Sequence, residues 1–330
     1  MREVASRAGV SAKTVSRVFN DDPHVLPETR AHVERVMREL NYVPNALATT
    51  FRSGRTSAIG IAVPDIVDPF FAAIARAVEQ VARHQGISTI VTSMGEDPKD
   101  ERPALESLLS RQLSGLIVAP VGTDHSWLAR WQEHTPIVCV DRAPIGLTTD
   151  TFTDDDAEGG YLATRHLIAH GHRRIAYIGD AIHLSTEAKR IAGWRRALEE
   201  ASIEVDENLI AVHTSDQLTT ELAMQRLRAL DHPPTAIFSA NARCTMSLVH
   251  VLKGNPLPLV GFGDFPLADV LTPSLTVIDQ DPTRIGTLAA ERVLARLDKP
   301  QSKLKRINVI AVSLIERESC TAGSPAPSSS

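Results

Sequence analysis

Hydrophobic residues near the start of the chain recur at helical spacing in three short segments. A turn containing Gly9 separates the first two segments, and Ser11 stands where an N-cap would open the second helix. The third segment runs from Pro27 to Leu40. The positions expected to face inward are Val4, Ala5, Ala8, Val15, Val18, Phe19, Val33, Val36, Met37 and Leu40. Three such helices can close a small core, which predicts an all-α helix-turn-helix domain over residues 1–44.

The opposite face of the second helix carries hydrogen-bond donors. Lys13, Ser16, Arg17 and Asn20 repeat there at i, i+3, i+4 and i+7. In a helix-turn-helix domain the second helix lies in the DNA major groove, and its N-terminal residues reach the base edges. The alternative is an ordinary helical hairpin whose charged face is solvated, because charged helix faces are common.

From residue 57 onward, short Val/Ile-rich runs alternate with amphipathic helices. Alternation of this kind predicts doubly wound parallel sheets in two α/β lobes, with a ligand cleft between them at the carboxyl ends of the strands. We expect an N-lobe over residues 57–156 and 281–307, and a C-lobe over 157–280 and 308–322. The expected strands are Ala58–Val63, Ser88–Thr92, Gly115–Ala119, Pro136–Val140, Arg174–Ile178, Leu209–Val212, Ala236–Ser239, Pro258–Phe262, Leu275–Ile278 and Asn308–Leu314.

Charge and composition narrow the class of protein. The chain carries a net charge of −5, but residues 1–56 hold nine Lys/Arg against six Asp/Glu, so the small N-terminal part is the basic one, as attraction to phosphate requires. No apolar run approaches the roughly 18 residues of a membrane span, and we expect a cytoplasmic protein without a membrane partner. The Pro/Ser-rich tail, residues 323–330, lacks periodicity and is expected to be disordered.

Motifs for catalysis, cofactors and metals are missing. The segment Gly261–Pro266 lacks the last glycine of a dinucleotide fingerprint, and no P-loop, G-x-S-x-G or H-E-x-x-H occurs. Cys139, Cys244 and Cys320 are widely spaced, which predicts buried thiols and neither a disulfide nor a metal site. We therefore expect no enzyme, cofactor or metal. A small-molecule binding or catalytic α/β protein whose N-terminal helices mediate association stays as the alternative.

The stretches AGVSAKTVSRVFN, VLPETRAHVERVMRELNYVPNALA and FRSGRTSAIG resemble the lactose-repressor (LacI/GalR) family of bacterial transcription regulators. The resemblance continues through VPDI, DPFF, GHRRIAYIG and RIAGW to LIERESC. It implies a periplasmic-binding-protein-like core and a regulator, expected to be a repressor of carbohydrate or related catabolic genes. Such a protein binds a palindromic operator in double-stranded DNA as a homodimer, with an affinity that a sugar, sugar acid or similar effector in the cleft modulates.

The resemblance also implies roles for residues of the DNA-binding part. Ala12, Lys13 and Arg17 occupy the main base-reading positions, where Lys and Arg suit guanine and the Ala12 methyl suits a thymine methyl. Residues 45–56 resemble the family's hinge helix and linker, which places an apolar wedge, here Phe51 in place of the usual leucine, in the minor groove. The other expected DNA contacts are Ser11, Thr14, Ser16, Asn20 and His24, mainly to phosphates, and Asn45 and Leu47 in the hinge.

Polar and aromatic residues at or near strand ends are the candidates for the effector cleft. Trp194 could instead be core packing, Arg142 an inter-lobe salt bridge, and Asp264 a turn or capping residue. Gly263 stands where many relatives have a carboxylate, which suggests a ligand that is acidic or less hydroxylated than a plain hexose. The candidates are Asp65, Phe70, Arg142, Arg190, Trp194, Asn241, Asp264 and Gln280.

Overall fold

A computed structural model describes residues 2–19, 22–40, 58–214 and 216–320 of the chain. The chain divides into two compact units, residues 1–56 and residues 57–330. The expected hinge helix with Asn45, Leu47 and Phe51 lies outside the described residues, as do Asn20 and the tail 323–330. No helix in the described part of the chain is long and apolar enough to cross a membrane.

The first unit is the predicted three-helix arrangement, with α1 (Arg2–Arg7), α2 (Ala12–Phe19) and α3 (Pro27–Glu39). Ser11 caps α2, because its Oγ accepts a hydrogen bond from the Thr14 backbone N–H at 3.0 Å. The miniature core consists of Val4, Ala5, Ala8, Val15, Val18, Val33 and Val36. The helix-turn-helix prediction is confirmed. Of the ten residues expected to face inward, these seven are buried, Met37 and Leu40 pack against them partly buried, and the side chain of Phe19 lies outside what the structure describes.

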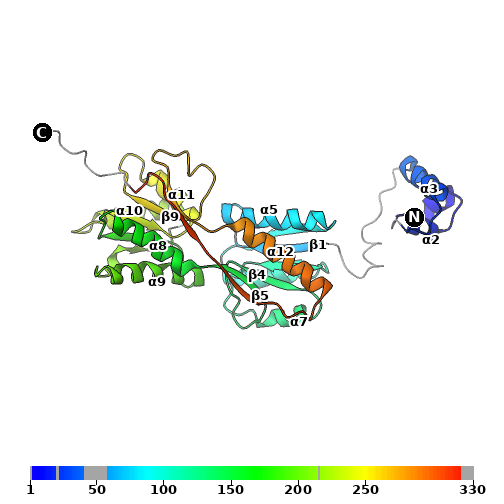
Figure 1. Ribbon diagram of the computed structural model, residues 1–330, viewed down its shortest axis with the longest axis horizontal. Helices are drawn as coiled ribbons and strands as arrows, with labels where there is room; N and C mark the ends of the chain where they lie inside the picture. The colour runs from blue at the N-terminus through cyan, green and yellow to red at the C-terminus, as the bar shows by residue number, and fades with distance from the viewer. Residues whose placement is uncertain (1, 20–21, 41–57, 215, 321–330) are drawn as a thin grey trace. The chain divides into compact units, whose positions relative to one another are not determined.

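The first lobe of the second unit contains a parallel sheet in the order β11-β5-β4-β3-β1-β2. Helices α5 (Pro69–His84) and α12 (Pro282–Asp298) pack on one face, and α6 (Pro98–Leu109) and α7 (Ala129–Gln132) lie with the core of the other. Figure 1 shows α5 and α12 side by side. The strands are β1 (Ala58–Val63), β2 (Ser88–Ser93), β3 (Gly115–Val118), β4 (Ile137–Val140), β5 (Asp150–Asp154) and β11 (Ile307–Ile310).

The second lobe repeats the plan in the order β12-β10-β9-β8-β6-β7, with β12 antiparallel to β10. Its helices are α8 (Asp156–Ala169), α9 (Ser185–Glu200), α10 (Gln217–Arg228) and α11 (Ala242–Val251). The apolar cores of the two sheet faces contain residues of α8 and α9 on one side and of α10 and α11 on the other. The strands are β6 (Ile175–Ile178), β7 (Ile210–Ala211), β8 (Ala236–Ser239), β9 (Leu259–Phe262), β10 (Thr276–Asp279) and β12 (Ser313–Ile315).

The chain crosses between the lobes three times: from β5 to α8, from β10 to α12, and from β11 to β12. One strand was missed and one strand prediction was wrong. The sequence did not indicate β5, because its residues DTFTD are polar, yet all five are buried between β4 and β11. The single strand expected over Asn308–Leu314 is two strands, one in each lobe, so the N-lobe extends to Ile310 rather than to residue 307.

Candidate effector site and DNA interface

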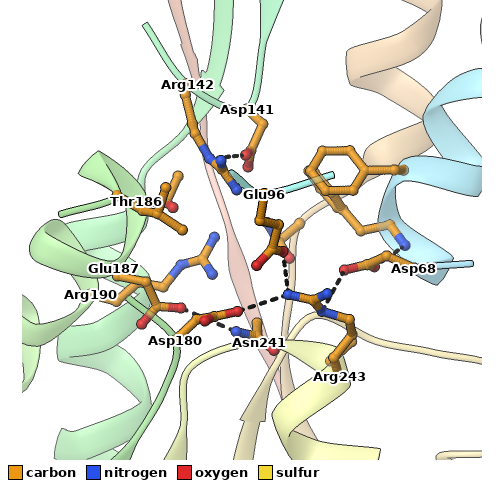
Figure 2. A pocket seen from close by; sticks show the side chains of 15 residues that line it. Asp68, Glu96, Asp141, Arg142, Asp180, Thr186, Glu187, Arg190, Asn241 and Arg243 are labelled. Carbon is orange, nitrogen blue, oxygen red and sulfur yellow. Dashed lines mark hydrogen bonds and ion pairs between the residues drawn. The ribbon is translucent and has the colours of Figure 1, made fainter. Parts of the chain in front are cut away.

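A cavity lies between the two lobes of the second unit, beside the carboxyl ends of their strands (Figure 2). Asp141 directly follows β4, Asp180 comes two residues after β6, and Asn241 two residues after β8. This position is where doubly wound sheets place their ligands. The lining residues are Asp68, Phe70, Phe71, Glu96, Asp141, Arg142, Asp180, Leu184, Thr186, Glu187, Arg190, Asn241, Ala242, Arg243 and Gln280.

Five of the eight residues that the sequence suggested for the cleft line this cavity: Phe70, Arg142, Arg190, Asn241 and Gln280. Asn241 Oδ1 accepts a hydrogen bond from the Cys244 backbone N–H at 2.9 Å, and its Nδ2 donates to Glu187 at 3.1 Å. The residue therefore caps α11 and at the same time holds a carboxylate of the cavity wall.

The other three candidates lie away from the cavity. Trp194 of α9 has no exposed surface. Its side chain packs in the core between α9 and the sheet, and its Nε1–H donates to the Ile175 carbonyl of β6. Asp264 accepts two hydrogen bonds from Arg317, at 2.7 and 3.1 Å. Asp65 accepts from the Val67 N–H and so stabilises the turn after β1. Each of these side chains makes its hydrogen bonds within its own lobe, and none of them lines the cavity.

Two of the cavity arginines, Arg142 of the N-lobe and Arg190 of the C-lobe, are each held by partners within their own lobe. The Arg142 Nε lies 2.9 Å from a carboxylate oxygen of Asp141, so the ion pair of Arg142 stays inside the N-lobe. Arg190 donates from Nε to Asp156 at 2.9 Å and from Nη1 to the Ala240 carbonyl at 2.7 Å. The Arg190 guanidinium also lies 3.9 Å over the ring of Phe262. Both groups are preorganised by their partners and present fixed positive charge to the cavity.

A third arginine, Arg243, connects the lobes (Figure 2). Its Nη2 donates to Asp180 of the C-lobe at 2.8 Å and to Glu96 of the N-lobe, and its Nε lies 3.9 Å from Asp68, also of the N-lobe. Burial raises the pKa of Asp68 above its usual value. Arg243 is 22% exposed in this network, so the ion pairs are largely shielded from solvent. We call Arg243 with Asp68, Glu96 and Asp180 the inter-lobe ion-pair network.

Sequence reasoning missed this network and all five carboxylates that line the cavity. Four of the acidic groups directly follow strands or lie in the loops after them, so the rule that selected Arg142 and Asn241 could have found them. Arg243 lies two residues after Asn241, which that rule did select. The missed lining residues with charge are Asp68, Glu96, Asp141, Asp180, Glu187 and Arg243.

Gly263 is required by backbone geometry. Its φ of +88° lies in the region that favours glycine, and a Cβ there would lie 3.0 Å from the Gln280 Oε1. Its lack of a carboxylate therefore fits the local fold and does not leave the cavity short of acceptors, because five other carboxylates line the wall.

Two further carboxylates lie buried at the first lobe crossing. Gln280 donates from Nε2 to Asp154 Oδ2 at 2.8 Å. Burial raises the pKa of Asp154 to about 8 and the pKa of Asp156 to about 6, with neighbouring acidic groups adding to the shift. Burial therefore favours the protonated form of Asp154.

In the first unit, the N-terminal part of α2 presents an open polar surface. Ser11, Ala12, Lys13 and Arg17 are exposed, and Thr14 is half-buried. His24 is also exposed, and its Nδ1 lies 3.0 Å from Asp22, which also faces the Arg17 Nε at 3.5 Å.

Ser16 does not share that surface. Only 7% of its area is exposed, because its position on α2 turns it toward the helix packing together with Val15. The i, i+3, i+4, i+7 pattern placed Ser16 on the groove-facing side, and the structure corrects that placement.

Comparison with known proteins shows which family has this combination of domains. Residues 1–45 match the bacterial regulatory proteins of the lacI family, and residues 56–317 match the periplasmic binding proteins and sugar binding domain of the LacI family. The chain belongs to the LacI family. It is a DNA-binding transcription regulator with an effector-binding core, as the sequence resemblance implied.

Individual relatives cover nearly the whole chain. The transcriptional repressor PurR of Mannheimia succiniciproducens is 31% identical over 94% of this chain and 95% of its own length. The transcriptional regulator GalR of Escherichia coli is 32% identical over 97% of this chain and 95% of its own. The lac repressor dimer bound to operator and the anti-inducer ONPF superposes with a TM-score of 0.83 at 25% identity, over 96% of this chain and 97% of that one.

Proposed function

We propose that this regulator represses carbohydrate or related catabolic genes by binding a palindromic operator as a cytoplasmic homodimer. A small polyhydroxylated ligand in the inter-lobe cavity changes its affinity for that operator. The observation that carries the proposal is the joint lining of the cavity by both lobes, since a ligand held there contacts two bodies whose separation can change. The protein acts by binding alone, without catalysis or a cofactor.

The lining chemistry favours a neutral sugar over a sugar acid. Three guanidinium groups face the cavity, and each already has a carboxylate partner: Asp141, Asp156 or the inter-lobe ion-pair network. Five carboxylates line the wall, so an added anion would meet a surplus of negative charge. Carboxylates accept hydrogen bonds from hydroxyls, and the Phe70–Phe71 corner offers an apolar surface to a sugar ring. This preference replaces the acidic ligand that Gly263 suggested.

Operator reading is assigned to the exposed side of α2. We propose that Lys13 and Arg17 read guanine edges and that Ala12 contacts a thymine methyl group. We propose that Ser11, Thr14 and His24 bind phosphates. Asn20 and the hinge residues Asn45, Leu47 and Phe51 complete the proposed interface from outside the described residues.

Coupling between ligand and operator follows from the inter-lobe ion-pair network. A ligand whose hydroxyls bind Asp68, Glu96 or Asp180 competes with Arg243 for the same oxygens. Ligand binding therefore favours one separation of the lobes over another, and that difference is the free energy available for changing operator affinity.

In vitro selection from random DNA duplexes tests the function without assuming an operator sequence. We expect a palindromic consensus whose binding weakens steeply with salt. Calorimetric titration with neutral pentoses and hexoses, and with the matching sugar acids, then tests the ligand class. A selection that yields no palindrome favours the alternative of a binding protein whose N-terminal helices mediate association. Tight binding of a sugar acid alone overturns the neutral-ligand proposal.

A further inference from the structure

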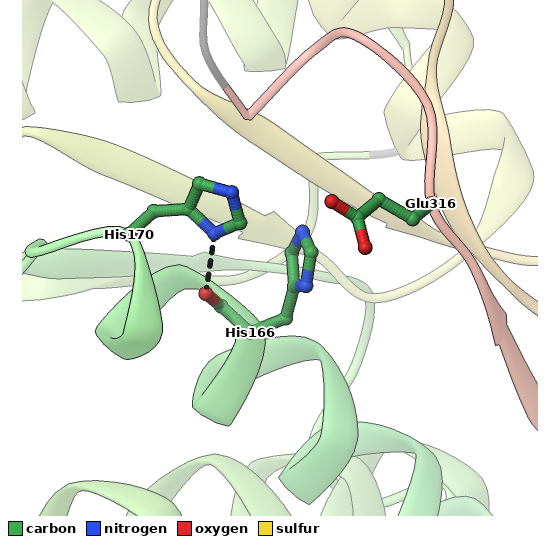
Figure 3. A group of neighbouring side chains, drawn as sticks. All are labelled: His166, His170 and Glu316. Atoms are coloured by element: carbon green, nitrogen blue, oxygen red, sulfur yellow. Dashed lines mark hydrogen bonds between the residues drawn. The ribbon is translucent and has the colours of Figure 1, made fainter.

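Three potential metal ligands meet at the end of α8, away from the inter-lobe cavity. His166 lies in the last turn of α8, His170 follows the helix end, and Glu316 directly follows β12 (Figure 3). One ligand atom from each residue lies within 4.8 Å of the others. The imidazole rings have centroids 4.4 Å apart. The i, i+4 spacing brings the two histidines to one side of the chain, and the fold brings the carboxylate to them.

Hydrogen bonding leaves a nitrogen lone pair of His170 available. The Nδ1 of His170 lies 2.9 Å from the His166 carbonyl oxygen, which can only accept. Nδ1 therefore carries the proton, and Nε2 keeps its lone pair in the neutral ring. Backbone carbonyl contacts of this kind fix the tautomer and orientation of metal-binding histidines.

His166 contributes an unsatisfied nitrogen to the same place. Its Nε2 is buried and has no hydrogen-bond partner among the described residues. A neutral imidazole nitrogen with a free lone pair is the form of histidine that ligates metals. A bound cation would satisfy this nitrogen, which protein groups leave without a partner.

We propose that His166, His170 and Glu316 form a binding site for a divalent late transition-metal ion such as Zn²⁺ or Ni²⁺. Two imidazole nitrogens and one carboxylate are a ligand set that these ions prefer over Mg²⁺ or Ca²⁺, which favour oxygen ligands. His170 and Glu316 are exposed, so an ion can reach the site from solvent.

The site would connect two segments that leave different lobe crossings. α8 begins directly after the first crossing, whereas Glu316 follows β12, which begins after the third. A bound ion therefore ties the end of α8 to the C-terminal strand of the same lobe and stabilises that lobe. None of the three residues lines the effector cavity, so metal binding stands apart from the proposed sugar site.

Calorimetric titration of the full-length, untagged chain with Zn²⁺, Ni²⁺ and Mg²⁺ tests the site. We expect one Zn²⁺ or Ni²⁺ per chain and no comparable binding of Mg²⁺. His170→Ala and Glu316→Gln each weaken Zn²⁺ binding at least about tenfold, because each removes a ligand of the ion. His250→Ala is the matched control: its Nδ1 contacts the Met246 carbonyl at 2.9 Å in the same i, i−4 geometry at the end of α11.

Visible absorption of the Co²⁺-loaded protein gives a second readout, and circular dichroism shows that each variant is folded. The Co²⁺ bands are expected to be lost in His170→Ala and kept in His250→Ala. Unchanged Zn²⁺ affinity in both His170→Ala and Glu316→Gln overturns the proposal. Equal weakening by His250→Ala also overturns it, because the binding would then be nonspecific among surface histidines.

Discussion

At the scale of single residues, Arg17 is the most informative position of the proposed operator surface. Its side chain is exposed on α2, and its one described ion pair, with Asp22 at 3.5 Å, is open to solvent. Such a pair contributes little stability, so the guanidinium can leave Asp22 for a guanine edge.

Arg17→Ala is expected to weaken binding to the selected operator by about 1–3 kcal/mol and to relax preference at one base pair. Fluorescence anisotropy with the consensus duplex and its single-base variants measures both effects. Arg35→Ala, at an exposed position on α3, serves as the charge-matched control. Uniform weakening over all duplexes would make Arg17 a phosphate contact instead.

Asp154 shows a residue-scale effect of burial on stability. In the folded protein its pKa is about 8, whereas an aspartate in an unfolded chain titrates near about 3.9. The unfolded state therefore binds fewer protons between these values, and this residue lowers the free energy of unfolding as the pH rises from about 4 to about 8.

Asp154→Asn removes that loss, because asparagine stays neutral and its Oδ1 can still accept the hydrogen bond from Gln280. The stability of the variant relative to the parent is expected to increase between pH 5 and pH 8. Urea unfolding at both pH values measures the change, with Asp231→Asn at an exposed position as control. A pH-independent difference would contradict the assignment.

At the scale of elements, the close packing of α8 against α9 positions Arg190. Gly160 of α8 and Gly193 of α9 allow the two backbones to approach. A Cβ on Gly193 would overlap the Ala157 carbonyl oxygen and lie 2.6 Å from the Tyr161 amide nitrogen. Arg190 lies less than one turn before Gly193, so helix spacing sets the position of its guanidinium in the cavity wall.

Gly193→Ala is expected to reduce the free energy of unfolding by about 1–3 kcal/mol, the usual cost of overpacking. Because the helices must separate, ligand affinity should fall as well. Urea unfolding and calorimetry measure the two effects. Glu199→Ala, at an exposed position on α9, is expected to change stability by less than about 0.5 kcal/mol. Equal stability of Gly193→Ala and the parent would show that the helices move apart without cost.

At the scale of the whole core, the inter-lobe ion-pair network adds a side-chain link between two lobes that the three chain crossings already connect. Each lobe has its own sheet and its own buried clusters, and Arg243 joins charges from both. Removing the Arg243 guanidinium leaves the carboxylates of Asp68, Glu96 and Asp180 without this positive partner.

Arg243→Gln is expected to widen the separation of the lobes in the ligand-free protein, which small-angle X-ray scattering records as a larger radius of gyration. Arg317→Gln is the control, because its ion pair with Asp264 lies within the C-lobe. Identical scattering from the two variants would show that the network does not set the lobe separation.

Much of the fold could be predicted because its information is local. Helical periodicity and the Ser11 cap gave the three-helix unit, and runs of Val and Ile gave nearly all buried strands. β5 escaped because its polar residues are stabilised by partners distant in sequence: Asp150 binds Arg292 at 2.6 Å and Arg296 at 2.7 Å. The local pattern of hydrophobic residues does not indicate ion pairs between residues so far apart in the chain.

The sequence alone determined the family, the two-lobed plan and five of the residues that line the cavity, because strand ends can be read from local pattern. Only the tertiary structure decided that Trp194 packs in the core of its lobe, that Asp264 pairs with Arg317, and that Arg243 meets Glu96 and Asp180. The His166, His170 and Glu316 cluster was likewise visible only in three dimensions. Contacts between residues far apart in the chain depend on how sheets and crossings bring side chains together, which no local pattern records.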